Sequence, residues 1–95
     1  MSTARIAKER IVRLETLARD AAEDGEVDQS RRYVRLAQRI AERNRLELPE
    51  TFKHFTCDRC DLYLRPSKNA QVRLHDGRVV MTCSCGEQNR YPYKD

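Results

Sequence analysis

Apolar residues in the first part of the chain recur with the spacing of a helix. Between residues 3 and 23 they fall within about half of a helical wheel, and charged residues take the other half. The segment Asp24-Gly25-Glu26 interrupts this period, and Gly25 is a typical helix terminator. The pattern therefore predicts an amphipathic helix over residues 3–23. Its apolar side consists of Ile6, Ala7, Ile11, Leu14, Leu17, Ala18, Ala21 and Ala22.

A second amphipathic helix is predicted over roughly residues 29–45, with Asp28 as its N-cap. The short acidic break before it favours an antiparallel helical hairpin. Each helix alone is only marginally stable in water, so the apolar faces pack on each other, on the cysteine-containing module or on a partner. The apolar side holds Tyr33, Leu36, Ala37, Ile40 and Ala41, while Arg32, Arg35, Arg39 and Arg43 line the opposite side at spacings of three or four.

The last part of the chain changes from helical to strand periodicity. Residues 46–56 read as a connector in which Pro49 ends any helical tendency. Val72 and Leu74 then share one face of an alternating segment, and Asp76-Gly77 is a typical two-residue hairpin turn before a strand over residues 78–82. We therefore expect an α+β chain, with a helical hairpin over 1–46, a linker over 47–56 and a small β-sheet module over 57–95.

The composition indicates that a hydrophobic core alone would not stabilise this chain. Only 39% of the 95 residues are apolar and 36% are charged, which is a weak basis for a core in so short a chain. Residues 29–46 contain six arginines and one glutamate. Such a concentration of positive charge favours a polyanion, such as nucleic acid, over the alternative of a merely solvated face.

The sequence has no feature of a secreted or membrane protein. A charged segment follows residues 1–10 instead of the apolar run of a signal peptide, and no apolar run is long enough to cross a bilayer. We therefore expect a cytoplasmic protein with no membrane partner. In a reducing compartment, paired cysteines are more often metal ligands than disulfides.

Four cysteines form two close pairs on either side of the predicted β-hairpin. Cys57 and Cys60 form a C-x-x-C pair, and Cys83 and Cys85 form a C-x-C pair. A hairpin between two such pairs brings four thiolates into a tetrahedron, which predicts one structural Zn²⁺ in a zinc ribbon. The second pair is one residue shorter than the usual C-x-x-C. If this tighter turn is strained, a histidine can replace one of the four sulfur ligands, and His54 is the only histidine suitably placed to do so. Disulfides and an iron–sulfur cluster are the alternatives.

Several motifs in their order along the chain resemble one family. They are Arg32-Tyr33-Val34-Arg35-Leu36-Ala37, the Leu48-Pro49 stop, the Cys57–Cys60 pair, Val72-Arg73-Leu74, the Thr82–Gly86 segment TCSCG, and Arg90-Tyr91-Pro92-Tyr93. Together they resemble the zinc-ribbon protein subunit of archaeal ribonuclease P, which has a related subunit in eukaryotic ribonuclease P and MRP. The resemblance covers residues 28–93.

The resemblance implies a noncatalytic subunit of the ribonuclease P holoenzyme, an endoribonuclease. Such a subunit assists a catalytic RNA in removing the 5′ leader of precursor tRNA. It also implies a small β-barrel protein subunit as a partner of the N-terminal helices, through Ile11, Leu14, Leu17, Leu36 and Ile40. The metal ligands carried over are Cys57, Cys60, Cys83 and Cys85. The basic positions that match are Arg32, Arg35, Arg39, Arg73 and Arg90, and Arg43 extends the helical row toward the RNA.

Two further alternatives follow from the residues. Tyr91 and Tyr93 can stack on exposed bases or close the core of the ribbon. A different function class is a zinc-ribbon protein-interaction module of a transcription or ribosome-associated complex. An independent enzyme is disfavoured, because a four-thiolate metal has no open coordination position and no catalytic triad or carboxylate pair is evident.

Overall fold

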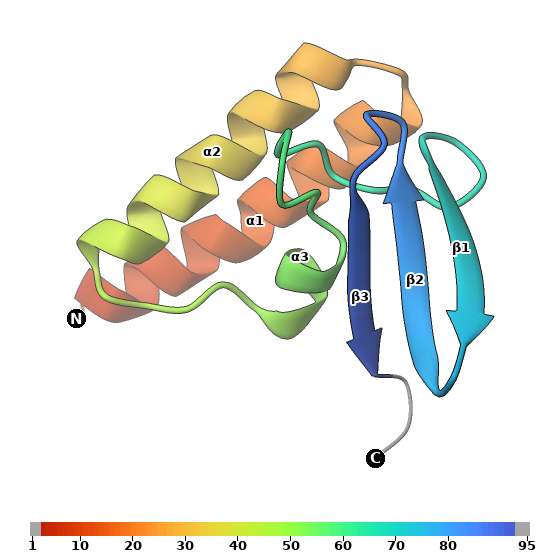
Figure 1. Ribbon diagram of the computed structural model, residues 1–95. Helices are drawn as coiled ribbons and strands as arrows, with labels where there is room; N and C mark the ends of the chain where they lie inside the picture. The colour runs from red at the N-terminus through yellow and green to blue at the C-terminus, as the bar shows by residue number, and fades with distance from the viewer. Residues whose placement is uncertain (1–2, 93–95) are drawn as a thin grey trace.

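The computed structural model describes residues 3–92, and its first half is an antiparallel pair of helices, α1 (Thr3–Glu23) and α2 (Val27–Arg43) (Figure 1). The chain reverses at Gly25, whose φ of +77° lies in the left-handed region that glycine adopts without strain. The prediction of Asp28 as the N-cap is wrong. Glu26 occupies that position, and Asp28 lies in the first turn of α2, where its carboxylate still faces the positive end of the helix dipole.

The buried face of α2 is rotated relative to the predicted one. Its buried residues are Ser30, Val34, Ala37 and Ala41. Small side chains allow α2 to approach Ala18 and Ala22 of α1 closely, and all of these alanines lie in one core cluster. As a result the larger Leu36 stays 41% exposed at the edge of the contact.

The predicted linker contains a third helix, α3 (Glu50–His54). Pro49 precedes this helix and does not prevent it, because a proline at a helix start gives up only an N–H that has no helical partner. Phe52 projects from α3 and is fully buried, between the helical hairpin and Tyr63. The short helix therefore connects the two halves through the core.

A three-stranded antiparallel sheet forms the second half, in the order β1 (Ala70–His75), β2 (Arg78–Cys83) and β3 (Gln88–Pro92). The predicted turn at Asp76-Gly77 is present, with both residues at positive φ, as a two-residue hairpin of this twist requires. Strand β3 was not predicted. Its sequence is polar, but Asn89 is buried and Tyr91 is half-buried on its inner face.

The helices and the sheet lie side by side and make a flat molecule of 44 × 33 × 18 Å. Strand β3 is nearest to α3, and β1 forms the far edge (Figure 1). The end of β2 that carries Cys83 lies opposite to the hairpin turn, on the side where α2 begins. None of the helices within residues 3–92 combines the length and apolar character of a membrane span. The α+β fold with a zinc-ribbon-like sheet, predicted from the sequence, is confirmed.

Candidate metal centre and nucleic-acid surfaces

The first cysteine pair lies in a tight turn after α3. The Cys57 N–H donates to the Leu62 carbonyl at 3.0 Å, and the Asp61 N–H donates to the Cys57 carbonyl at 3.0 Å. These bonds hold the turn closed and point the Cys60 N–H toward Cys57 Sγ, at 3.5 Å. An N–H directed at sulfur favours the thiolate, which is the form that binds metal.

The second cysteine pair lies in the turn between β2 and β3. The Cys83 N–H donates to the Glu87 carbonyl at 2.8 Å, and the Gly86 N–H donates to the Cys83 carbonyl at 2.9 Å. Gly86 has a φ of +98°, a conformation that side chains rarely adopt. A residue with a side chain at this position would be strained, so the turn as it stands favours glycine.

The two turns bring the four sulfur atoms together. Their Sγ atoms all lie within 4.8 Å of one another. The Sγ atoms of Cys57 and Cys85 are 3.6 Å apart, and those of Cys60 and Cys83 are 3.7 Å apart. A tetrahedron with metal–sulfur bonds of about 2.3 Å has edges of about 3.8 Å, whereas a disulfide joins its sulfurs at about 2.05 Å. The spacing therefore fits a single tetrahedral ion, and all four cysteines are free of disulfides.

His54 does not belong to this cluster. Its imidazole stacks on the Tyr91 ring, with ring centres 4.0 Å apart and planes 5° from parallel. Tyr91 is thus half-buried against the sheet and α3, which is the core placement considered for it, and Tyr93 lies outside the described residues.

The thiols of the cluster differ in pKa. Burial raises the pKa of the Cys57 thiol to about 12. Burial also acts to raise the pKa of Cys60, but the Leu62 N–H and the Arg31 guanidinium outweigh it and lower that pKa to about 7. Burial raises the pKa of Cys83 as well. Two buried thiols are therefore costly to ionise without a cation among them, which is what a metal ion supplies.

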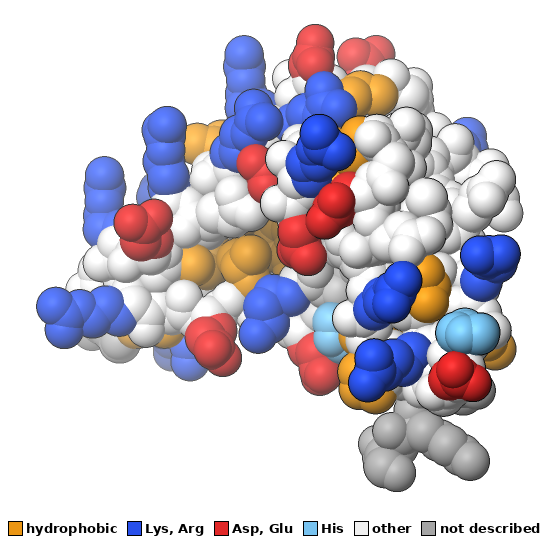
Figure 2. All heavy atoms as spheres, viewed as in Figure 1, with side chains coloured by type: hydrophobic (Ala, Val, Ile, Leu, Met, Phe, Trp, Pro, Cys, Tyr) orange, Lys and Arg blue, Asp and Glu red, His pale blue; other side chains and the backbone are white. Residues whose placement is uncertain are grey.

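The predicted basic residues lie on two separate surfaces. Arg32, Arg35, Arg39 and Arg43 are all exposed along α2. Arg35 is also engaged within the chain, because its Nε donates to Asp61 Oδ2 at 3.0 Å. Lysine and arginine side chains gather over α2 and, separately, over the sheet on the face seen in Figure 2.

The basic surface on the sheet follows from strand register. Arg73 on β1 pairs with Val80 on β2, and Val80 pairs with Arg90 on β3, so the three side chains share one face. Arg78 and His75 lie two residues from these positions and line the same shallow hollow. Arg78 was not among the basic residues predicted to bind RNA. The strand pattern could have indicated Arg78, because residues two apart on a strand point to the same face of the sheet.

The residues predicted to bind a protein partner divide into two groups. Ile11 is only 1% exposed within the core between the helices, and Leu14 and Leu17 are half-buried. Leu36 and Ile40 line a shallow hollow between α1 and α2, next to Ile6 and Ala7, and the arginines at its edge are Arg10, Arg39 and Arg43. Ile6 is 42% exposed and was not among the predicted partner residues.

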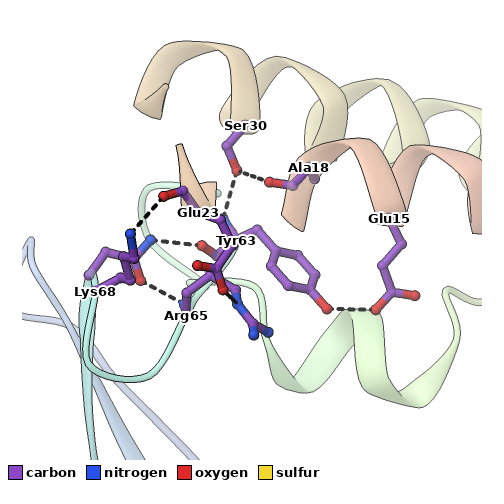
Figure 3. A network of polar contacts seen from close by, with 8 residues as sticks. Glu15, Ala18, Glu23, Ser30, Tyr63, Arg65 and Lys68 are labelled. Carbon is purple, nitrogen blue, oxygen red and sulfur yellow. Dashed lines mark hydrogen bonds and ion pairs between the residues drawn. The ribbon is translucent and has the colours of Figure 1, made fainter. Parts of the chain in front are cut away.

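A polar network fastens the helical hairpin to the cysteine-bearing half (Figure 3). The Tyr63 hydroxyl donates to Glu15 Oε2 at 2.8 Å, and burial together with that carboxylate raises the pKa of Tyr63. Arg65 Nε donates to Glu23 Oε1 at 2.6 Å. Buried Ser30 donates to the Ala18 carbonyl at 2.9 Å and accepts from the Tyr63 N–H at 3.3 Å. The helical hairpin is therefore joined by polar contacts to the segment that leads from the first cysteine pair to β1.

A helical hairpin fused to a four-cysteine ribbon defines this class of protein. Residues 10–86 match the family model described as the RNAse P Rpr2/Rpp21/SNM1 subunit domain. The chain belongs to this family, which confirms the resemblance seen in the sequence.

Curated relatives and solved structures agree with that assignment. The chain is 61% identical over 90 residues to "Ribonuclease P protein component 4" of Halobacterium salinarum, covering 95% of this chain and 97% of the relative. It is 42% identical to the protein of the same name from Methanosarcina barkeri, covering 94% and 83%.

Among solved structures, a chain in the "cryo-EM structure of archaeal Ribonuclease P with mature tRNA" matches at a TM-score of 0.89 and 38% identity, over 97% of this chain and 80% of that one. The structure described as "Pfu Rpp21" matches at a TM-score of 0.64 and 32% identity, over 92% and 99%. The match within the ribonucleoprotein covers nearly the whole of this chain.

Proposed function

We propose that this chain is a protein subunit of ribonuclease P that assists the catalytic RNA in removing the 5′ leader of precursor tRNA. The observation that carries the proposal is the match, at a TM-score of 0.89 over 97% of the chain, to a chain in archaeal ribonuclease P with mature tRNA. The protein acts in the cytoplasm and does not itself cleave a bond. Its one candidate metal centre among the described residues has four thiols, which leave no position for a reacting water.

The metal is a structural Zn²⁺ held by Cys57, Cys60, Cys83 and Cys85. Four sulfurs at tetrahedral spacing suit zinc, and the bound ion supplies a crosslink between the two cysteine turns. Cys83 ends β2 and the other three sulfurs lie close to its own, so the role of the ion is to fix the register of β2 relative to the loop before β1. The basic face of the sheet depends on that register.

RNA binds through both basic surfaces. Arg32, Arg39 and Arg43 on α2 and Arg73 and Arg90 on the sheet present guanidinium groups to phosphates, and Arg78 adds to the second surface. Phosphate contacts give affinity without base specificity and make binding depend on salt. Arg35 contributes less to RNA binding than its neighbours, because Asp61 neutralises it in part.

The hollow between α1 and α2 is the docking site for a second protein subunit, a small β-barrel. Its lining is apolar at Ile6, Leu36 and Ile40, and it also includes arginine side chains. Exposed apolar groups of this kind in one place are typical of an interaction surface. Leu14 and Leu17, which are half-buried on α1 and do not line the hollow, join the contact in this proposal.

Reconstituted cleavage of a precursor tRNA tests the RNA role. The cognate RNA and remaining subunits are assayed with the wild-type chain, without it, and with Arg73→Ala/Arg90→Ala. We expect the variant to bind RNA more weakly, to lower the salt slope by about one for each phosphate that it no longer neutralises, and to raise the magnesium concentration needed for cleavage. Arg5→Ala/Arg13→Ala, on the exposed side of α1, is the charge-matched control. RNA affinity that is equal in both variants would favour the protein-interaction module.

Two exposed leucines test the docking site. Leu36 lies in the hollow and Leu74 lies on β1, with exposed fractions of 41% and 65%. Leu36→Asp places a charge in the proposed contact and should weaken binding of the β-barrel subunit by tenfold or more, about 1.4 kcal/mol. Leu74→Asp should leave that affinity unchanged. If the two variants bind equally well, the hollow is not the docking site.

A further inference from the structure

Hydrogen bonds from Asn69 connect the second cysteine turn to the segment that follows the first one. The Asn69 carbonyl accepts from the N–H of Ser84, the residue between the two cysteines of the second pair, at 3.0 Å. The Asn69 side chain reaches the other segment, because its Nδ2 donates to the Tyr63 carbonyl at 3.0 Å and its Oδ1 accepts from the Arg65 N–H at 2.7 Å. Asn69 therefore joins two stretches of chain that lie next to metal ligands.

The segment bonded by Asn69 is itself held to the first cysteine turn. The Cys57 N–H donates to the Leu62 carbonyl at 3.0 Å. The next residue, Tyr63, forms a β-bridge with Thr56, the residue before Cys57. A displacement of Tyr63 therefore moves the backbone on either side of this ligand.

A second asparagine links the sheet to the start of the first cysteine turn. Asn89 on β3 is 6% exposed, and its Nδ2 donates to the carbonyl of Thr56, directly before Cys57. Within the sheet, Asn89 pairs with Met81 of β2, two residues before Cys83. Its Oδ1 has no hydrogen-bond partner in the part of the chain that the structure describes, so the bond to Thr56 is what this buried amide gains. Asn89 thus connects a residue beside one ligand with the strand that carries another.

We propose that Asn69 and Asn89 are positioning residues of the metal centre, which hold its two cysteine turns close to each other before the metal binds. The inference rests on the zinc site of the proposed function and deepens it. Ligands that are already in place lose little conformational freedom when the ion arrives, so the ion binds more tightly. The two links favour the metal-binding arrangement in the metal-free chain, and the ion then stabilises that arrangement further.

Zinc affinity of the full-length chain, measured by competition with a chromophoric chelator, tests the proposal. The apparent dissociation constant rises as the fraction of chains in the binding-competent arrangement falls. One lost hydrogen bond changes such an equilibrium by about tenfold. We therefore expect Asn69→Ala and Asn89→Ala each to weaken zinc binding by about tenfold. Asn69 is only half-buried, so Asn69→Ala keeps the test open if Asn89→Ala does not fold.

Asn44 supplies a matched control at the end of α2. It is also half-buried, and its Nδ2 also donates to a backbone carbonyl, that of Ile40, at 2.9 Å. Asn44→Ala should lower the urea midpoint as Asn69→Ala does, because each variant loses a side-chain bond to the backbone. Its zinc affinity should stay within about twofold of the wild type, since the site is distant from the cysteines. If Asn44→Ala weakens zinc binding as much as Asn69→Ala, the effect is one of general stability and the positioning role is wrong.

Disulfide formation in the metal-free chain measures how close the two cysteine turns lie. Oxidised glutathione takes two electrons and two protons from a pair of thiols, which form an S–S bond, and it leaves as two molecules of reduced glutathione. In the wild type, Cys57 with Cys85 and Cys60 with Cys83, whose sulfurs lie 3.6 and 3.7 Å apart, should crosslink the two turns. In Asn69→Ala these crosslinks should give way to a disulfide between Cys57 and Cys60, which forms within one turn.

Mass spectrometry of tryptic peptides distinguishes the two kinds of disulfide. Trypsin cleaves after Arg59, between the two cysteines of the first pair, so each of these cysteines is recovered with its own partner peptide. Unchanged zinc affinity together with unchanged crosslinks in both asparagine variants would overturn the inference while leaving the zinc site intact. A wild-type chain that takes up no zinc would overturn both the inference and the zinc site on which it rests.

Discussion

Isoleucine occurs on both the buried and the exposed sides of α1, so this helix contains its own control. Ile11 is 1% exposed within the core, and Ile6 is 42% exposed at the hollow. Ile11→Ala should cost about 2–5 kcal/mol of unfolding free energy, because it removes buried methylene groups and leaves a cavity. Ile6→Ala should cost less than about 1 kcal/mol. Urea unfolding of the metal-loaded chains measures both, and equal losses would contradict the placement of Ile11 in the core.

Ionisation of the Tyr63 hydroxyl should make the free energy of unfolding depend on pH. Burial and the Glu15 carboxylate raise its pKa in the folded chain above the unfolded value. The stabilisation from its protonated hydroxyl is therefore fully present below the unfolded pKa of about 10 and is lost as the pH rises toward the folded value. Tyr63→Phe should cost about 1–3 kcal/mol at neutral pH, since it removes a bond to a charged group, and should flatten the alkaline loss of stability.

The control for that variant is Tyr33→Phe. The Tyr33 hydroxyl accepts a hydrogen bond from exposed Gln29 at 3.1 Å and leaves no buried group unpaired when it is removed. Its unfolding free energy should change by less than about 0.5 kcal/mol, and its pH profile should follow the wild type. Parallel alkaline profiles for both variants would show that Tyr63 does not carry the pH dependence.

At the scale of single helices and strands, the sequence pattern predicted those features that depend mainly on the geometry of neighbouring residues. The β-hairpin followed from the alternation at Val72 and Leu74 and from Asp76-Gly77, whose two left-handed residues match the turn. The cysteine cluster followed from spacing, because a hairpin between two close pairs leaves few other arrangements for four sulfurs. Helical periodicity predicted α1 and α2 for the same reason.

Features that depend on tertiary contacts were not predictable in this way. Helix α3 exists because Phe52 has a core to enter, and strand β3 exists because β2 offers it a partner, so neither shows a strong local signal. The face of α2 was misjudged because its buried row includes a serine. Burial of Ser30 depends on two partners that the sequence does not place beside it, the Ala18 carbonyl and the Tyr63 N–H.

Ser30 supports a prediction about how these elements are joined. Ser30→Ala removes both bonds and leaves the Tyr63 N–H without its partner in the core, which should cost about 1–3 kcal/mol. Hydrogen exchange should be faster at the Tyr63 amide than in the wild type. Thr16→Ala, which removes an exposed hydroxyl from α1, should change neither quantity. Unchanged exchange at Tyr63 in Ser30→Ala would show that the serine does not hold the turn.

At the scale of the whole molecule, polar contacts join the helices that carry one basic surface to the segment that leads into the sheet, which carries the other. The core around Phe52 includes Tyr63 and residues of both long helices, and Phe55 packs against both core clusters. Both groups of basic side chains are visible from one side (Figure 2). The molecule is only 18 Å thick along its shortest axis, so much of its surface is available to partners. A folded RNA can therefore meet α2 and the sheet together, provided that the metal keeps the sheet in place.

Metal removal tests that dependence. Binding to the folded chain alone stabilises it by mass action, so the unfolding midpoint should rise with free zinc and fall when a chelator is added. A chelator already loaded with zinc is the control. Acid should have the effect of the chelator, because protons compete for the four thiolates and the buried Cys57 thiol has its pKa raised to about 12. Hydrogen exchange should then lose protection at β2, including Met81, before it does so at Ala18 and Val34 in the helices. A chain whose midpoint and β2 protection are the same with and without zinc would show that the ribbon folds without its metal.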